Sequence, residues 1–94
     1  MDYLELANLI PAEKRDEVSD QLTDFILASK NDEKMPNNLA NALLLEMKNR
    51  ELNSYAGLTM LLEASLLLEA EKTISFFGQL QLNKIVEKIK ENSA

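Results

Sequence analysis

The stretch "GLTMLLEASLLLEAE", residues 57–71, decides how the rest of the chain is interpreted, because it is apolar on almost every side of a helix. Nine of its residues are Leu, Met or Ala, and only small polar residues and three glutamates interrupt them. At about 100° per residue, one uncharged stripe contains Gly57, Leu58, Leu61, Ala64, Ser65 and Leu68. A second stripe on the far side includes Leu62 and Leu66. This helix belongs in the middle of a structure, and its second stripe has to be covered by another helix or another molecule.

The rest of the sequence predicts more helices around this one. Pro11 and Pro36 each precede a run with helical spacing, and proline suits the first turn of a helix. Ser54 can cap the leucine-rich helix, and Gly78 marks the expected break after it. No run alternates as a strand does, and 18 residues are leucine. We predict an all-α protein, a compact bundle of four to five helices around the leucine-rich central helix, in a single domain over 1–94. The expected helices are 2–9, 11–30, 36–52, 54–77 and 79–91.

Composition excludes several classes of function. The chain has no cysteine and no histidine, which excludes disulfides, thiol or imidazole catalysis and zinc sites built on those side chains. No G-x-G or G-K-[ST] loop is present to bind a nucleotide phosphate. A net charge of -6 works against nucleic acid and anionic lipid as partners. Glu63 and Glu69 interrupt the longest apolar stretch, so we expect no membrane span. We also expect no cofactor and a cytoplasmic location.

Acidic residues gather on one stripe of the predicted helix 11–30. The stripe contains Glu13, Asp16, Glu17, Asp20 and Asp24. Carboxylates spaced by three and four residues can bind a divalent cation, so a metal-dependent hydrolase is one hypothesis. The stripe lies opposite the apolar face that includes Leu22 and Phe25, however, and should therefore point to water. We expect a solvated face, or a surface for a basic protein partner, and no metal.

Glu63 is the second candidate for chemistry, because it lies among apolar residues on the central helix. A desolvated carboxylate could serve as an acid or a base. The sequence offers it no catalytic companion, since histidine is missing and the only arginines are Arg15 and Arg50. We expect a structural role for Glu63, at the rim of an interface or hydrogen-bonded to Thr59 or Tyr55.

These observations favour an interaction protein over an enzyme. Phe76 and Phe77 could line a ligand pocket, but aromatic residues at helical spacing more often belong to a core or an interface. We predict a helical protein–protein interaction module without catalytic residues that forms a homodimer. The leading interface residues are Leu62, Leu66, Phe76 and Phe77, with Leu45 and Leu52 behind them.

Overall fold

Short capping signals set where most of the helices begin. The computed structural model describes residues 2–91. Its elements are α1 (Tyr3–Leu9), the 3-10 helix η1 (Ala12–Lys14), α2 (Arg15–Ser29), α3 (Asn37–Lys48), α4 (Tyr55–Ala70) and α5 (Phe76–Glu91). No strand occurs among these residues. The prediction of an all-α bundle of four to five helices is confirmed.

Three helices begin at a side chain that accepts a free backbone N–H group. The Asp2 carboxylate accepts a hydrogen bond from the Glu5 N–H at 2.8 Å. The Ser54 hydroxyl accepts the Gly57 N–H at 3.0 Å, and the Ser75 hydroxyl accepts the Gly78 N–H at 3.2 Å. Each bond satisfies a donor that the first turn of a helix leaves without a partner.

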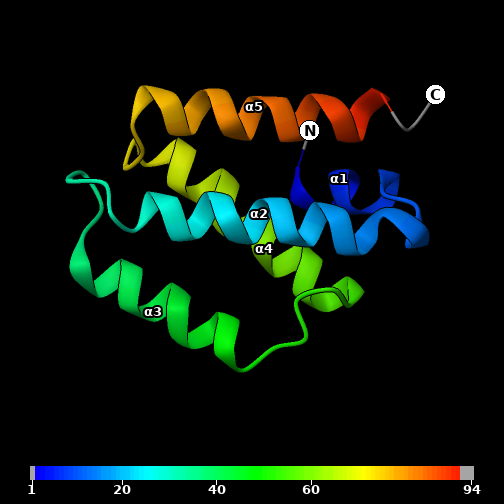
Figure 1. Ribbon diagram of the computed structural model, residues 1–94, viewed down its shortest axis with the longest axis horizontal. Helices are drawn as coiled ribbons and strands as arrows, with labels where there is room; N and C mark the ends of the chain where they lie inside the picture. Colours follow the sequence, from blue (N-terminus) through cyan, green and yellow to red (C-terminus); the bar gives the residue numbers. More distant parts are fainter. Residues whose placement is uncertain (1, 92–94) are drawn as a thin grey trace.

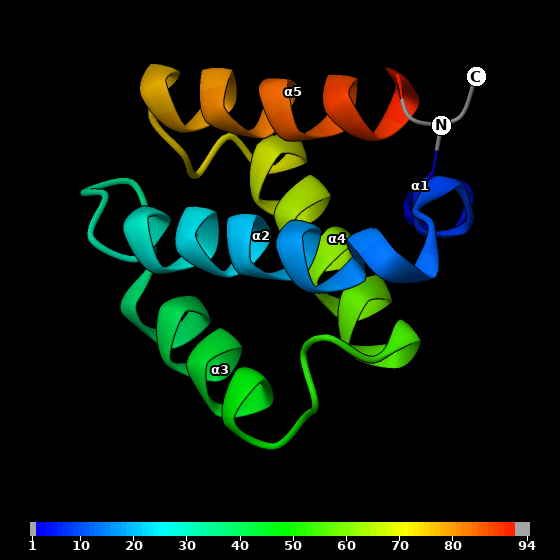
Figure 2. The same cartoon turned by 45° about the vertical axis from the view of Figure 1, so that its right-hand side comes forward.

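The leucine-rich helix α4 lies in the middle of the molecule, as the sequence predicts. It contacts α1 and α2, while α5 packs against α1 and α2 on one side and α3 lies on the other (Figures 1 and 2). All six residues of its first stripe are buried. The largest fully buried side chains around it include Leu6, Leu22, Phe25, Leu68, Ile74 and Leu82. In the described part of the chain, no helix is both long enough and apolar enough to cross a membrane.

The predicted helix 36–52 ends earlier than expected. Helix α3 stops at Lys48, so Leu52 lies in the connection to α4. The Leu52 carbonyl accepts a hydrogen bond from the buried Ser19 hydroxyl at 2.7 Å, which fastens this connection to α2. Gly57, in the first turn of α4, is buried where the same connection passes over it. The connection therefore holds α3 in place through contacts that helical periodicity does not reveal.

The predicted break at Gly78 is wrong. Helix α4 ends at Ala70 and α5 begins at Phe76, so Gly78 lies inside the first turn of α5. A glycine in a first turn needs no special backbone conformation, and its φ is negative. The helix start is fixed instead by Ser75, whose hydroxyl caps the turn.

The end of α4 is a Schellman turn built without glycine. Lys72 has a φ of 56°, the only positive φ among the described non-glycine residues. The Thr73 N–H donates to the Leu68 carbonyl at 3.2 Å, and the Lys72 N–H donates to the Glu69 carbonyl at 3.0 Å. This pair of bonds defines the motif, in which glycine usually takes the left-handed position. A lysine in that position pays a steric cost that glycine avoids.

Lys72→Gly is therefore expected to stabilise the protein. Glycine avoids the cost of the left-handed conformation, which is about 1–2 kcal/mol for a residue with a side chain. Its greater freedom in the unfolded chain offsets about 0.4–1 kcal/mol of this gain. The free energy of unfolding, measured by urea denaturation, should rise by roughly 0.5–1 kcal/mol. Lys30→Gly is the matched control, because Lys30 ends α2 at a φ of -62° and glycine gains nothing there. Equal changes in the two variants would contradict this explanation.

Candidate interaction surface

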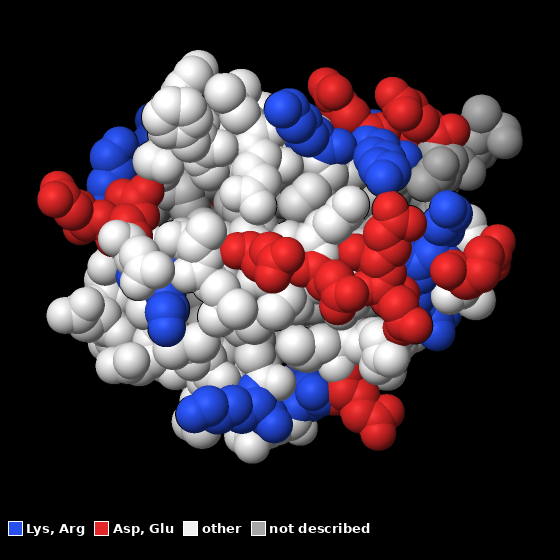
Figure 3. All heavy atoms as spheres, viewed as in Figure 1, with Lys and Arg blue, Asp and Glu red and all other residues white. Residues whose placement is uncertain are grey.

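The first half of α5 exposes large apolar side chains to solvent. The segment 73–83 carries no charged residue. Within it, Phe76 is 68% exposed, Phe77 is 81% exposed and Leu80 is 43% exposed. We call these three residues the α5 apolar patch. The two phenylalanine rings meet edge to face, with their centroids 6.4 Å apart. Figure 3 shows uncharged surface over this half of α5.

The size of the α5 apolar patch separates it from the scattered apolar residues of an ordinary surface. Two phenylalanines exposed to this degree present roughly 300 Å² of apolar area. That is comparable with the largest apolar patch on a typical monomer, which is often functional. Leu80 was not predicted as part of it, although it lies one turn after Phe76 in the same uncharged segment.

The six predicted interface residues do not form one surface. Phe76 and Phe77 are exposed, as an interface requires. Leu62 is completely buried within the chain, so its place in the predicted interface is wrong: helices of the same chain cover both stripes of α4 at this level. Leu52 and Leu66 are partly buried against the core. Leu45 is 60% exposed, but it belongs to α3, on the opposite side of the molecule from α5 (Figures 1 and 2).

The acidic stripe of α2 points to solvent, as predicted. All five of its carboxylates are exposed. Among residues 2–91, no three acidic side chains come together in an arrangement that could hold a metal ion. Figure 3 shows acidic side chains in a row along α2, with one end of the row beside the uncharged half of α5 and the rest below its lysines. Asp16, Asp20 and Asp24 form no ion pair within the described chain.

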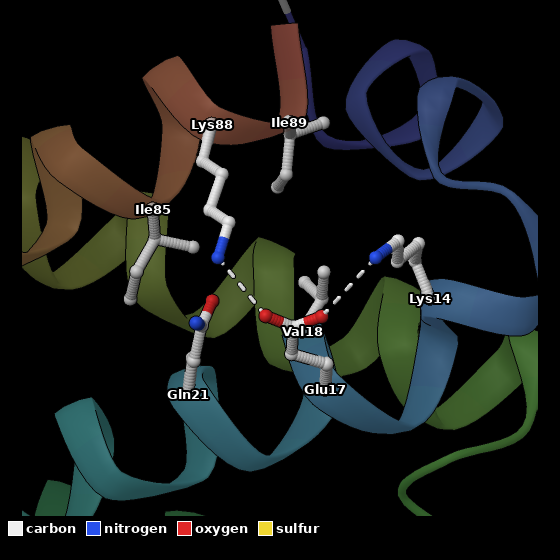
Figure 4. Close-up of a pocket in the computed structure, with 7 residues that line it drawn as sticks. All are labelled: Lys14, Glu17, Val18, Gln21, Ile85, Lys88 and Ile89. Carbon is white, nitrogen blue, oxygen red and sulfur yellow. Dashed lines mark hydrogen bonds and ion pairs between the residues drawn. The ribbon is translucent and has the colours of Figure 1, made fainter. Parts of the chain in front are cut away.

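Glu17 is the exception in this row, because it links α2 to α5. The Lys88 ammonium donates a hydrogen bond to one Glu17 oxygen at 2.9 Å, and the Lys14 ammonium lies 3.8 Å from the other (Figure 4). The hydrogen bond from Lys88 and the two positive charges lower the pKa of the Glu17 carboxyl below its usual value. The pair is exposed, so it contributes little to the stability of the fold.

Three neighbouring hollows follow the seam between α2 and α5, and we call them together the α2–α5 groove. The first is lined by Ala28, Ser29, Asp32, Ser75, Phe77, Gly78 and Gln81. The second is lined by Gln21, Asp24, Gln81, Lys84 and Ile85. The third is lined by Lys14, Glu17, Val18, Gln21, Ile85, Lys88 and Ile89 (Figure 4). Gln81 joins the first hollow to the second, and Gln21 and Ile85 join the second to the third.

The groove differs from one end to the other. Its third hollow is bridged by the Glu17–Lys88 pair, with Val18, Ile85 and Ile89 beneath (Figure 4). Its first hollow lies beside the exposed ring of Phe77.

The loop before α3 helps to form the first hollow. The Asp32 carboxylate accepts the Lys34 N–H at 3.0 Å. This bond lowers the pKa of the Asp32 carboxyl. Asp32 and Ser75 line the first hollow together, and the Ser75 hydroxyl caps the turn from which Phe76 and Phe77 project.

Glu63 lies on the surface of α4, on the side that faces α3. It is exposed, and it borders a shallow hollow between α3 and α4 whose other lining residues are Leu43, Glu46, Met60, Ala64 and Leu67. No hydrogen bond joins it to Tyr55 or Thr59 within the described residues: the Tyr55 hydroxyl donates to the Asn8 side chain at 2.9 Å, and the Thr59 hydroxyl donates to the Ala56 carbonyl at 2.8 Å.

Comparisons with models of known protein families, with curated proteins and with solved structures give no match. Function is therefore inferred from the surface just described.

Proposed function

We propose that this protein is a small helical protein–protein interaction module that self-associates through the α5 apolar patch. The exposure of Phe76 and Phe77 at the start of α5 carries this proposal. Burying apolar surface contributes roughly 25 cal/mol per Å², and twofold pairing covers the same patch on both partners. The chemistry of the chain agrees, since it has no cysteine or histidine to serve as a nucleophile or base.

The size of the patch also indicates how strong this association should be. Two copies of the α5 apolar patch bury roughly 600 Å² through the phenylalanines, whereas stable interfaces bury about 1,200–2,000 Å². Surrounding uncharged residues of 73–83 therefore have to join the contact. We expect a dimer that dissociates at micromolar concentrations.

No second function is proposed from the acidic stripe. A hydrolase would need its carboxylates turned toward one bound cation. On α2 they point outward along the helix, and within residues 2–91 no three acidic side chains converge on one point.

The mass of the protein in solution tests the proposal. Light scattering should give 10.6 kDa when the protein is dilute, rising toward twice that value as the concentration increases. The double variant Phe76→Asp, Phe77→Asp should remain at the mass of one chain, because two carboxylates replace the apolar contact. Leu45→Asp, which places a charge on the exposed side of α3, should behave like the unaltered protein. A mass of one chain for all three proteins at every concentration would overturn the proposal.

A further inference from the structure

Helix α3 is attached to the rest of the protein more loosely than the other helices. The closely packed pairs of helices join α1, α2, α4 and α5 to one another, and α3 is in none of them. Each of those four helices contributes at least one large side chain that is fully buried, whereas α3 contributes none. Only Ala40 and Met47 of its 12 residues are buried. A segment with so few buried apolar contacts opens at a lower free energy than the core of a protein.

The polar interactions of α3 are local. Asn38 accepts the Leu39 N–H at 2.9 Å, and Glu46 pairs with Arg50 at 3.2 Å. Within residues 2–91, no hydrogen bond or ion pair joins a residue of α3 to another helix. Helix α5, in contrast, has the ion pair with α2 described above. Undocking of α3 therefore breaks no polar contact with another helix in this part of the chain.

The contact between α3 and α4 is also incomplete. The shallow hollow between them is lined by Leu43 from α3 and by Met60 and Ala64 from α4, among others, and has a volume of about 220 Å³. Side chains do not fill this space, so the two helices gain less apolar burial and fewer dispersion contacts than a close-packed pair would.

The chain holds α3 mainly at its two ends. Met35, in the loop before α3, is buried. After α3, the Leu52 carbonyl accepts the hydrogen bond from Ser19, and the connection lies against Gly57. Isolated helices shorter than about 12–15 residues are marginal in water, so α3 depends on its docking to remain helical. We infer that α3 is a strap that undocks from α4 and unfolds locally while its two ends and the other four α-helices stay in place.

Opening of the strap changes which apolar surface the protein presents. It uncovers Met60 and Ala64 on α4 and releases Leu43 and Met47 of α3. This surface lies on the opposite side of the molecule from α5 (Figures 1 and 2). The α5 apolar patch is exposed in both states, whereas the second apolar surface is exposed only when α3 is open. This inference goes beyond the proposed function and does not rest on it, because opening of α3 requires no partner.

Cysteine labelling tests the inference, since the chain has no cysteine of its own. Ala40→Cys places a thiol on the buried side of α3. Ser65→Cys places one in the core of α4, where the serine hydroxyl has no hydrogen-bond partner to lose within the described chain. Ala42→Cys places one on the exposed side of α3 and gives the rate for a thiol that is always accessible. The rate of reaction with an excess of a thiol reagent is measured on dilute protein, with and without low concentrations of urea.

The three rates should fall in a definite order. We expect Ala40→Cys to react at least about 100-fold faster than Ser65→Cys, because local opening needs less free energy than unfolding of the whole protein. It should react at least about tenfold more slowly than Ala42→Cys, because α3 is docked most of the time. Low urea should hardly change the rate of Ala40→Cys and should raise that of Ser65→Cys steeply, since the effect of urea grows with the surface that opening exposes.

Hydrogen exchange of the unaltered protein gives the same comparison without a substitution. The backbone amides of residues 41–48 should exchange at least about 100-fold faster than those of residues 61–68. Equal protection of the two segments, or equal rates and urea dependence for Ala40→Cys and Ser65→Cys, would mean that α3 opens only when the whole protein unfolds, and would overturn the inference. Equal rates for Ala40→Cys and Ala42→Cys would also overturn it, because α3 would then not be docked. None of these results depends on self-association through α5, so the two proposals can fail separately.

Discussion

Gly57→Ala is expected to destabilise the protein by about 2–3 kcal/mol, as overpacking of a tight site does. A Cβ atom at this position would lie 2.7 Å from the Leu52 Cα and still closer to the Glu51 carbonyl oxygen. Both are backbone atoms, so neither can move aside without displacing the connection between α3 and α4. For a domain of this size the melting temperature should fall by roughly 10–20 °C, measured by circular dichroism together with urea denaturation.

Gly78→Ala is the matched control for this prediction. Gly78 is also in a first helical turn, but a Cβ there would meet Ile74 at 3.4 Å, which is an ordinary contact. Alanine favours a helix over glycine by about 0.5–1 kcal/mol, so Gly78→Ala should raise the melting temperature slightly. Opposite signs for the two substitutions are expected. If both glycines tolerated alanine equally, the connection would not pass over Gly57 as closely as described.

The consequence of Gly57→Ala should extend beyond α4. The connection over Gly57 also carries the Leu52 carbonyl, to which the Ser19 hydroxyl of α2 donates a hydrogen bond. A displaced connection therefore loses this bond and loosens the attachment of α3. The groove between α2 and α5 lies on the other side of the molecule and should keep its shape in the fraction that remains folded (Figures 1 and 2).

The sequence predicted helix starts better than helix ends, for a physical reason. Ser54 is a side chain whose capping chemistry is local, so its role can be recognised without knowing the fold. The end of α4 at Lys72 has no such mark, because lysine rarely takes a left-handed conformation and nothing in its neighbours signals that it does here. Gly78 was predicted to end a helix because glycine commonly follows the last helical residue, but it lies in the first turn of α5.

The candidate surface was predictable only in part. The uncharged segment 73–83 and the phenylalanines within it are visible in the sequence, and both phenylalanines are exposed. The α2–α5 groove is not visible in the sequence, because it depends on how α2 packs along α5. Periodicity describes the faces of one helix but does not identify the neighbouring helix that covers each face. The same limit explains why Leu62 was assigned to an interface.

Leu62→Ala should destabilise the protein by about 3–5 kcal/mol, a large part of the 5–15 kcal/mol that a small domain has in total. Leu62 is completely buried within the chain, so removing its methyl groups leaves a cavity in the core of each molecule. Leu67→Ala is the control, because Leu67 is five residues further along α4 and 49% exposed, and it should cost less than about 1 kcal/mol.

Two measurements on Leu62→Ala distinguish a core residue from an interface residue. For a core residue, urea denaturation of dilute protein shows the full loss of stability, and the mass of the protein that remains folded depends on concentration as before. An interface residue would give the reverse, with little change in the stability of the dilute protein and a clear loss of self-association. We expect the first result, because Leu62 is completely buried within the chain and has no exposed surface with which to contact a partner.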